Sequence, residues 1–139
     1  MKIDRLLAMF ALGAVLTAPQ TALAAKAMLT ATLSGSNETG GGDADGTGSF
    51  SAEVDADAGD FCYSLAATNI AKATMAHVHS GAAGANGPPV VTLELGSDLC
   101  LAIDPEVLKA IAASPANYYV NVHNAEFPAG AVRGQLAGK

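Results

Sequence analysis

The sequence predicts an all-β protein, an antiparallel β-sandwich of the Greek-key or immunoglobulin-like type. Short segments in which apolar and polar residues alternate recur along the chain, which is typical of strands with one buried face. Clusters of glycine, asparagine, aspartate and proline separate these segments and indicate turns. Tryptophan is absent, so we expect a thin core built mostly from valine, leucine, isoleucine and a few aromatic rings.

Seven segments fit this pattern, a number that suits such a sandwich. They cover residues 27–33, 47–55, 60–68, 73–79, 90–95, 118–124 and 130–136. The run of glycine and aspartate over 40–46 predicts a surface loop. Gly59 ends the short connection between the second and third segments and is expected to adopt a positive φ there.

The sequence predicts one helix, which follows Asp104. This residue can cap the helix, Pro105 suits its first position, and Ser114 with Pro115 ends it. Apolar residues inside it fall on one face. We expect the helix to close a long connection rather than to build the core.

The chain begins with the features of a secretory signal peptide. Lys2 and Arg5 precede an apolar run that ends at the small-residue sequence Ala22-Leu23-Ala24, so residues 1–24 are predicted to be removed. Residues 25–139 then form one exported domain, periplasmic or secreted. The apolar run is shorter than the roughly 20 residues of a membrane-spanning helix, and we expect no membrane span.

Charge and motif content argue against several functions. The whole chain carries a net charge of −6. The predicted signal peptide holds two of the seven basic and one of the 13 acidic residues, which leaves five against 12 and a charge of about −7. Nucleic acid is therefore an unfavourable partner. Phosphate-binding loops and nucleophile elbows are absent from the sequence, so we expect no nucleotide cofactor and favour a non-enzymatic protein.

The chain contains two cysteines, Cys62 and Cys100. Export would bring both to an oxidising compartment, where an even number usually means a disulfide. We predict one Cys62–Cys100 bridge, because neither residue lies in a motif for a thiolate metal site or covalent haem.

All three histidines of the chain lie in two predicted strands. Alternation places Met75, His77 and His79 on one face of the fourth strand and sends Ala76 and Val78 to the core. In the strand over 118–124, the same reasoning turns Tyr119, Asn121 and His123 away from the core. In the last strand it turns Arg133 and Gln135 outward. We expect the histidines to face out.

If these strands are neighbours, their outer faces gather a candidate metal site. Histidines two residues apart on a strand can reach one transition metal, and His123 would complete a three-nitrogen site. Neutral imidazole suits copper, zinc, nickel or haem iron. The Met28 and Met75 thioethers could assist Cu(I), although methionine in an alanine-rich sandwich is more often a core filler. The hairpin loop over 125–130 makes His123 and Arg133 candidate cross-strand neighbours. The alternative is that these histidines are polar residues on a solvated sheet face.

Two stretches resemble the CHRD domain family, named from chordin. They are AHVHSGAAGANGPPVV and YYVNVHNAEFPAGAVRGQL, preceded by ATLSGSNET and a strand containing Gly-Thr-Gly. The resemblance implies an all-β sandwich and an extracytoplasmic module without an established catalytic activity. It maps the histidines of the family motif onto His77, His79 and His123, and the arginine onto Arg133. One departure is that the early segment of the family, GAQEVPP, reads GSNETGGG here.

Three hypotheses follow for the function. In the first, the outer-face histidines bind a transition metal, either copper or haem iron, and haem would need a site between the subunits of a homodimer. In the second, the protein is a metal-free interaction or envelope-structural module with a protein partner. The third rests on the His-Val-His sequence, which is similar to the copper ligands of copper-zinc superoxide dismutases. Three histidines cannot supply that full ligand set, so only a copper-only dismutase relative fits.

Overall fold

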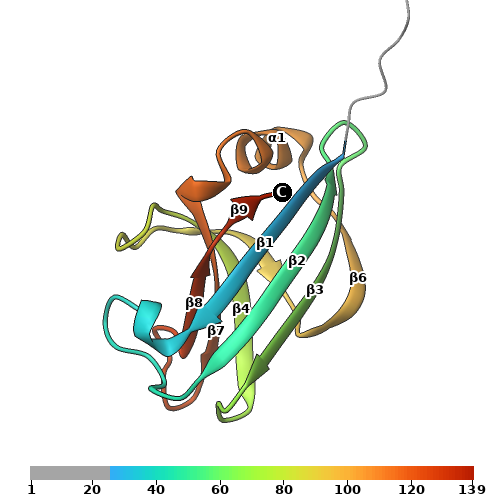
Figure 1. The fold of residues 1–139 in the computed structure, drawn as a ribbon. Coiled ribbons are helices and arrows are strands. Elements are labelled where there is room, and N and C mark those ends of the chain that lie inside the picture. Colours follow the sequence, from blue (N-terminus) through green and yellow to red (C-terminus); the bar gives the residue numbers. More distant parts are fainter. Residues whose placement is uncertain (1–25) are drawn as a thin grey trace, which may run out of the picture.

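The computed structural model describes residues 26–139, and the predicted signal peptide over 1–24 lies outside this range. One antiparallel sheet of nine strands dominates the described part (Figure 1). The strands are β1 (Ala27–Ser34), β2 (Thr47–Asp55), β3 (Asp60–Thr68), β4 (Ala73–Ser80), β5 (Pro89–Leu93), β6 (Gly96–Ala102), β7 (Tyr118–Asn124), β8 (Val132–Gln135) and β9 (Ala137–Gly138). The helices are α1 (Pro105–Ala113) and the short 3-10 helices η1 (Gly35–Asn37) and η2 (Pro115–Asn117). Within residues 26–139, none of the helices has the length and apolar character needed to cross a membrane.

The sheet curls into two layers that face each other across the core. Its strand order is β5-β4-β7-β8-β1-β2-β3-β6, with β9 beside β1. β1 and β8 join the layers through the pair Ser34 and Arg133. Gly134 permits this junction, because a Cβ at that position would collide with the carbonyl oxygen of Thr32. The all-β antiparallel sandwich predicted from the sequence is therefore confirmed.

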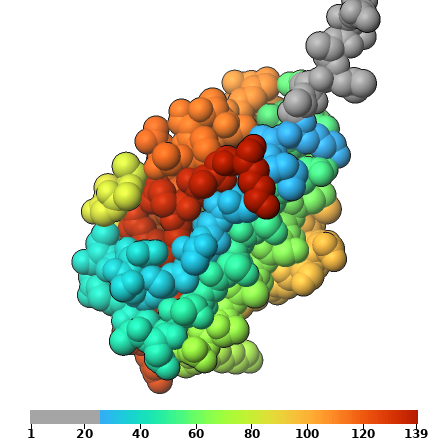
Figure 2. Space-filling model, in the orientation of Figure 1, coloured from blue at the N-terminus to red at the C-terminus, as the bar shows by residue number. Residues whose placement is uncertain are grey.

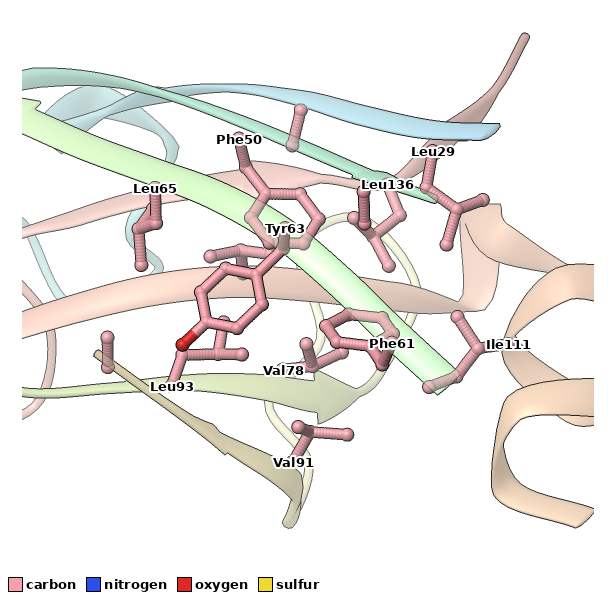
Figure 3. Packing of buried hydrophobic residues seen from close by; sticks show 14 of the residues in the cluster. Leu29, Phe50, Phe61, Tyr63, Leu65, Val78, Val91, Leu93, Ile111 and Leu136 are labelled. Atoms are coloured by element: carbon pink, nitrogen blue, oxygen red, sulfur yellow. The ribbon is translucent and has the colours of Figure 1, made fainter. Parts of the chain in front are cut away.

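The core lies between these layers and combines aromatic with branched aliphatic side chains (Figure 3). Phe50 on β2 packs beside Phe61 and Tyr63 on β3, with ring centroids 5.7–6.2 Å apart. Val78 on β4 and Val91 on β5 face these rings from the opposite layer. The core side of β4 is therefore occupied by apolar residues, which leaves its other face for polar side chains.

The seven predicted strands are present, but the structure adds two strands that the sequence reading missed. β6 begins with Gly-Ser-Asp, which indicates a turn, and Asp98 does adopt a positive φ of 56°. The remainder of β6 pairs with β3, and this partnership sustains an extended conformation despite the weak local signal. β9 is only two residues long and depends on pairing with β1. Gly59 has the expected positive φ, 79°.

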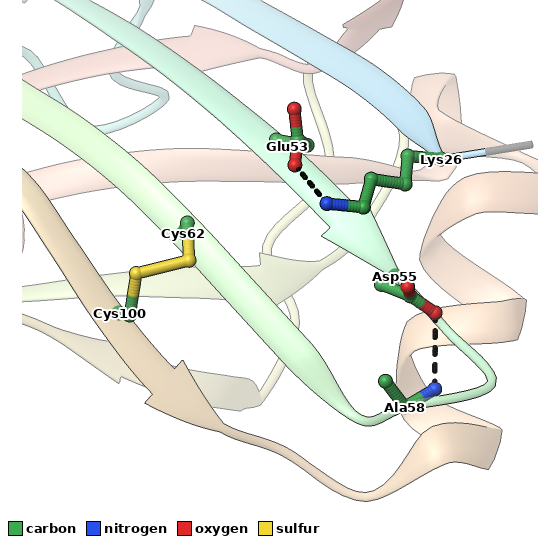
Figure 4. A network of polar contacts seen from close by, with 6 residues as sticks. All are labelled: Lys26, Glu53, Asp55, Ala58, Cys62 and Cys100. Atoms are coloured by element: carbon green, nitrogen blue, oxygen red, sulfur yellow. Dashed lines mark hydrogen bonds and ion pairs between the residues drawn. A yellow bond between two sulfur atoms is a disulfide. The ribbon is translucent and has the colours of Figure 1, made fainter.

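The predicted disulfide between Cys62 and Cys100 is confirmed (Figure 4). The two cysteines are directly opposite each other on β3 and β6, so the bridge fastens the strand at the end of the sheet to its neighbour. At the end of the nearby β2–β3 hairpin, Asp55 accepts a hydrogen bond from the backbone N–H of Ala58. A disulfide is compatible with an exported protein.

The helix has the predicted bounds but a different role. The Asp104 carboxylate accepts from the backbone N–H of Glu106, as expected of a cap. However, Leu108 and Ile111 are fully buried and belong to the main core. The expectation that α1 only closes a connection was therefore wrong, because its apolar face closes one end of the space between the layers (Figures 1 and 3).

Candidate metal centre

Neighbouring strands bring the three histidines together. β4 pairs with β7 in a register that places Met75 opposite His123 and His77 opposite Asn121, so all these side chains share the face turned away from the core. His123 is thus diagonal to His77, and His79 follows two residues further along β4. Among residues 26–139, His77, His79 and His123 are the one group of three potential metal ligands whose ligating atoms all lie within 4.8 Å of one another.

Backbone carbonyl groups determine the tautomers of two rings. Nδ1 of His79 lies 2.8 Å from the carbonyl oxygen of Gly87, and Nδ1 of His123 lies 3.0 Å from that of Pro128. A carbonyl oxygen only accepts, so both Nδ1 atoms carry a proton, and each ring in its neutral form presents a lone pair at Nε2. Metal-bound histidines commonly donate their other ring N–H to such an oxygen, which orients the ring and raises its basicity.

The third ring completes a compact arrangement. Nδ1 of His77 lies 3.2 Å from Nε2 of His123. Since Nε2 of His123 holds a lone pair, His77 donates this hydrogen bond in the metal-free protein. Two nitrogens bound tetrahedrally to one ion, with metal–nitrogen bonds of about 2.0–2.1 Å, lie about 3.3 Å apart. A metal ion could therefore replace the shared proton if that proton moves from Nδ1 to Nε2 of His77, which gives the neutral tautomer with a lone pair at Nδ1.

Two of the three rings, His77 and His123, favour the uncharged form that metals need. Burial lowers the pKa of His77 below its ordinary value of 6.5, and repulsion from His123 and His79 adds to this effect. Burial also lowers the pKa of His123, while the Pro128 carbonyl acts in the opposite direction. Neutral imidazoles at pH 7 are ready ligands.

These pKa shifts predict how the stability of the metal-free protein depends on pH. Below the ordinary pKa of 6.5 the unfolded chain takes up protons that folded His77 and His123 resist, so the free energy of unfolding falls as the pH decreases from 6.5 to their lowered pKa values. Urea unfolding at pH 7.5 and 5.5 measures this loss. We expect His77→Gln and His123→Gln each to lose less stability over this interval than the wild type. An equal loss in all three proteins would contradict the prediction.

The histidine face is turned away from the core, as expected, but it is not a solvated surface. His123 is only 7% exposed, and Asn121 and Arg133 are 3% and 2% exposed. Loops after β1, β4 and β7 cover this face. Two of them, the cyan segment after β1 and the yellow segment after β4, lie on the same side of the molecule, near the red C-terminal strands (Figure 2). Alternation along single strands could not predict this cover.

Arg133 holds one of these loops, and it lies diagonal to His123 across the pair β7 and β8 rather than directly opposite it. The register of β7 and β8 places Arg133 opposite Asn121. Its guanidinium lies 3.4 Å from the centre of the Tyr119 ring and donates to the side chain of Asn86 and to the backbone carbonyls of Ala82 and Ala85. The loop over 81–88 is therefore tied to the sheet by Arg133.

Tyr119 connects this loop to the histidines. Its ring stacks on His79, with centroids 4.9 Å apart and planes inclined by 6°, and its hydroxyl accepts from the backbone N–H of Gly87. Since the Gly87 carbonyl in turn accepts from His79, Arg133 and Tyr119 support His79 indirectly. The carbonyls of Gly87 and Pro128 were not foreseen, because backbone partners depend on how loops fold.

The remaining predicted residues take different places. Gln135 donates to the backbone carbonyls of Gly81 and Tyr118, so its side chain connects the start of the loop over 81–88 to β7 and does not contact the histidines through these bonds. Met75 is 52% exposed and paired with His123 at the open side of the cluster. Glu38, which the sequence reading overlooked, lines a cavity of about 270 Å³ together with His79 and Asn121.

Comparison with known proteins gives one result. The family model described as CHRD domain matches residues 29–136, which include both strands of the histidine cluster. Curated proteins and solved structures yield no match.

Proposed function

The chain belongs to the CHRD domain family, and from this premise we propose that its histidine cluster binds one copper ion in an exported, non-enzymatic protein. The observation that supports this most directly is the orientation of His79 and His123. Each ring donates a hydrogen bond from Nδ1 to a backbone carbonyl, which leaves the Nε2 lone pairs available to a shared ion.

Ligand chemistry favours copper among the metals. A set of imidazoles binds Cu²⁺ more strongly than the other divalent ions of the first transition row. Met75, paired with His123, adds a thioether near the cluster, and this soft ligand suits Cu(I). Haem is less well supported, because three imidazoles converge on one point whereas haem iron takes one or two axial ligands. The proposed role is to carry or store copper outside the cytoplasm, in the periplasm or after secretion.

Copper titration of the mature protein tests this proposal. The protein is purified from the exported fraction without a His-tag, stripped with a chelator and titrated with Cu²⁺, and bound copper is measured by metal analysis. We expect one copper per chain in the wild type and background copper in the double variant His77→Ala, His79→Ala, because a single remaining imidazole cannot hold the ion.

Thr92→Ala is the matched control. Thr92 is exposed and directly opposite His77 on β5, so its loss alters the same sheet face without removing a nitrogen ligand. It should bind copper as the wild type does, and circular dichroism should show all three proteins folded. Equal copper in the double variant would overturn the site. Background copper in the wild type would favour the metal-free interaction module instead.

A further inference from the structure

A cavity beside the histidine cluster gathers unsatisfied hydrogen-bond acceptors. Among residues 26–139, three buried side-chain atoms lack a hydrogen-bond partner, namely Oε1 of Glu38, Nε2 of His79 and Oδ1 of Asn121. All three residues line the same cavity of about 270 Å³. Buried polar groups nearly always form hydrogen bonds in folded proteins. Three atoms without a hydrogen-bond partner around one cavity therefore indicate a ligand that would donate to them.

Each of the three atoms can only accept a hydrogen bond. Glu38 offers a carboxylate oxygen, Asn121 offers an amide oxygen, and Nε2 of His79 holds a lone pair because Nδ1 carries the proton. One water molecule has two donor hydrogens and cannot satisfy all three acceptors. A primary ammonium group has three donors and no acceptor, which matches this set.

Charge points to the same ligand. The described part of the chain contains two ion pairs, and Glu38 belongs to neither. The nearby Arg133 directs its guanidinium to the loop over 81–88 instead. Burial raises the pKa of Glu38, an effect that Arg133 and the amide of Asn121 partly offset. A half-buried carboxylate that belongs to neither ion pair favours a cation that also donates hydrogen bonds.

The walls of the cavity are firmly placed. Asn121 is 97% buried on β7, since its exposed fraction is 3%, and Tyr119 beside it is fixed by Arg133. Gly130 has a φ of 143°, and a Cβ there would collide with the Glu38 carboxylate, so this glycine leaves the space that Glu38 occupies. The acceptors are thus held in position before a ligand arrives.

We propose that this cavity binds the primary ammonium group of a small amine or of a lysine side chain. This inference goes beyond the copper site and holds for the metal-free protein. Because His79 lines the cavity and also belongs to the metal cluster, bound copper and bound ammonium should compete.

NMR titration of the metal-free mature protein tests the inference. Methylammonium chloride is added to ¹⁵N-labelled protein, with tetramethylammonium chloride at equal ionic strength as a probe of the same charge without N–H donors. We expect saturable shifts at the side-chain amide of Asn121 and at the backbone of Gly41, Gly87 and Gly130, which line the cavity, with methylammonium only.

Two variants make the result specific. Glu38→Gln keeps the shape of the side chain but removes the charge and should weaken methylammonium binding at least tenfold. Glu94→Gln, at an exposed glutamate that does not line this cavity, should bind as the wild type does. Nα-acetyl-lysine amide distinguishes the sources, since tighter binding than methylammonium indicates a lysine of a partner protein and weaker binding indicates a free amine.

The outcomes of the two proposals are separable. No saturable shift, equal binding of tetramethylammonium, or unchanged binding by Glu38→Gln would overturn the ammonium site, whatever the copper titration shows. Methylammonium binding that copper displaces would support both sites. Binding in a wild type that takes up no copper would leave the ammonium site standing alone.

Discussion

Replacing both Cys62 and Cys100 by alanine is expected to lower the free energy of unfolding by about 4 kcal/mol. The bridge joins residues 38 positions apart, and closing a loop of this size restricts the unfolded chain by about that amount in the chain-entropy model. It also fastens β6, the strand at the end of the sheet, to β3. Urea unfolding followed by circular dichroism measures the change.

A reductant supplies the matched control for this prediction. Dithiothreitol should destabilise the wild type by a similar amount and leave the double-alanine variant unchanged, because the variant has no bridge to reduce. If the free energy of unfolding of the variant falls by less than about 1 kcal/mol, the hydrogen-bonded pairing of β3 with β6 is sufficient to stabilise this end of the sheet without the disulfide.

Replacing Arg133 by alanine is expected to destabilise the protein by about 3 kcal/mol and to weaken copper binding about tenfold. Arg133 is 2% exposed, and it donates charge-assisted hydrogen bonds to the loop over 81–88 and lies over the Tyr119 ring. Such hydrogen bonds contribute about 1.5–3 kcal/mol each, and cation–π contacts about 1–2, but water can replace part of the loss at the loop. Losing a group that orients a metal ligand costs about 10–100-fold in metal affinity.

The copper affinity of Arg133 variants distinguishes a role in positioning His79 from a role in folding stability alone. Arg133→Lys keeps the charge but lacks the planar fork that reaches several acceptors, so it should recover only part of the copper affinity. Lys109→Ala, which breaks an exposed ion pair with Glu106, should change stability by less than about 1 kcal/mol and leave copper binding intact. Copper affinity that stays at the wild-type value in folded Arg133→Ala would show that the loop does not position His79.

Residues whose environment follows from local pattern were predicted well. The faces of β4 and β7 follow from alternation, since Val78, Val120 and Val122 are fully buried and the histidines lie opposite them. The helix cap at Asp104 and the positive φ of Gly59 depend on their immediate neighbours and were also predicted. The disulfide needed only an even cysteine count and an oxidising compartment.

Features that depend on distant partners were not predicted. β6 exists because β3 lies beside it, although its first residues indicate a turn. α1 contributes Leu108 and Ile111 to the core. The sequence predicts the apolar face of this helix, but not the part of the fold against which that face packs. The role of Glu38 required a loop after β1 to meet the face of β7, more than 80 residues further along the chain.

The sequence by itself therefore determined the all-β class, which side of each strand the histidines occupy, and the pairing of the two cysteines. Only the tertiary structure decided that β4 and β7 are neighbours, that loops cover the histidine face, and which backbone carbonyls set the ring tautomers. The physical reason is the distance along the chain over which each feature is determined. Side-chain alternation is a property of one strand, whereas the convergence of His77, His79 and His123 depends on contacts between segments more than 40 residues apart.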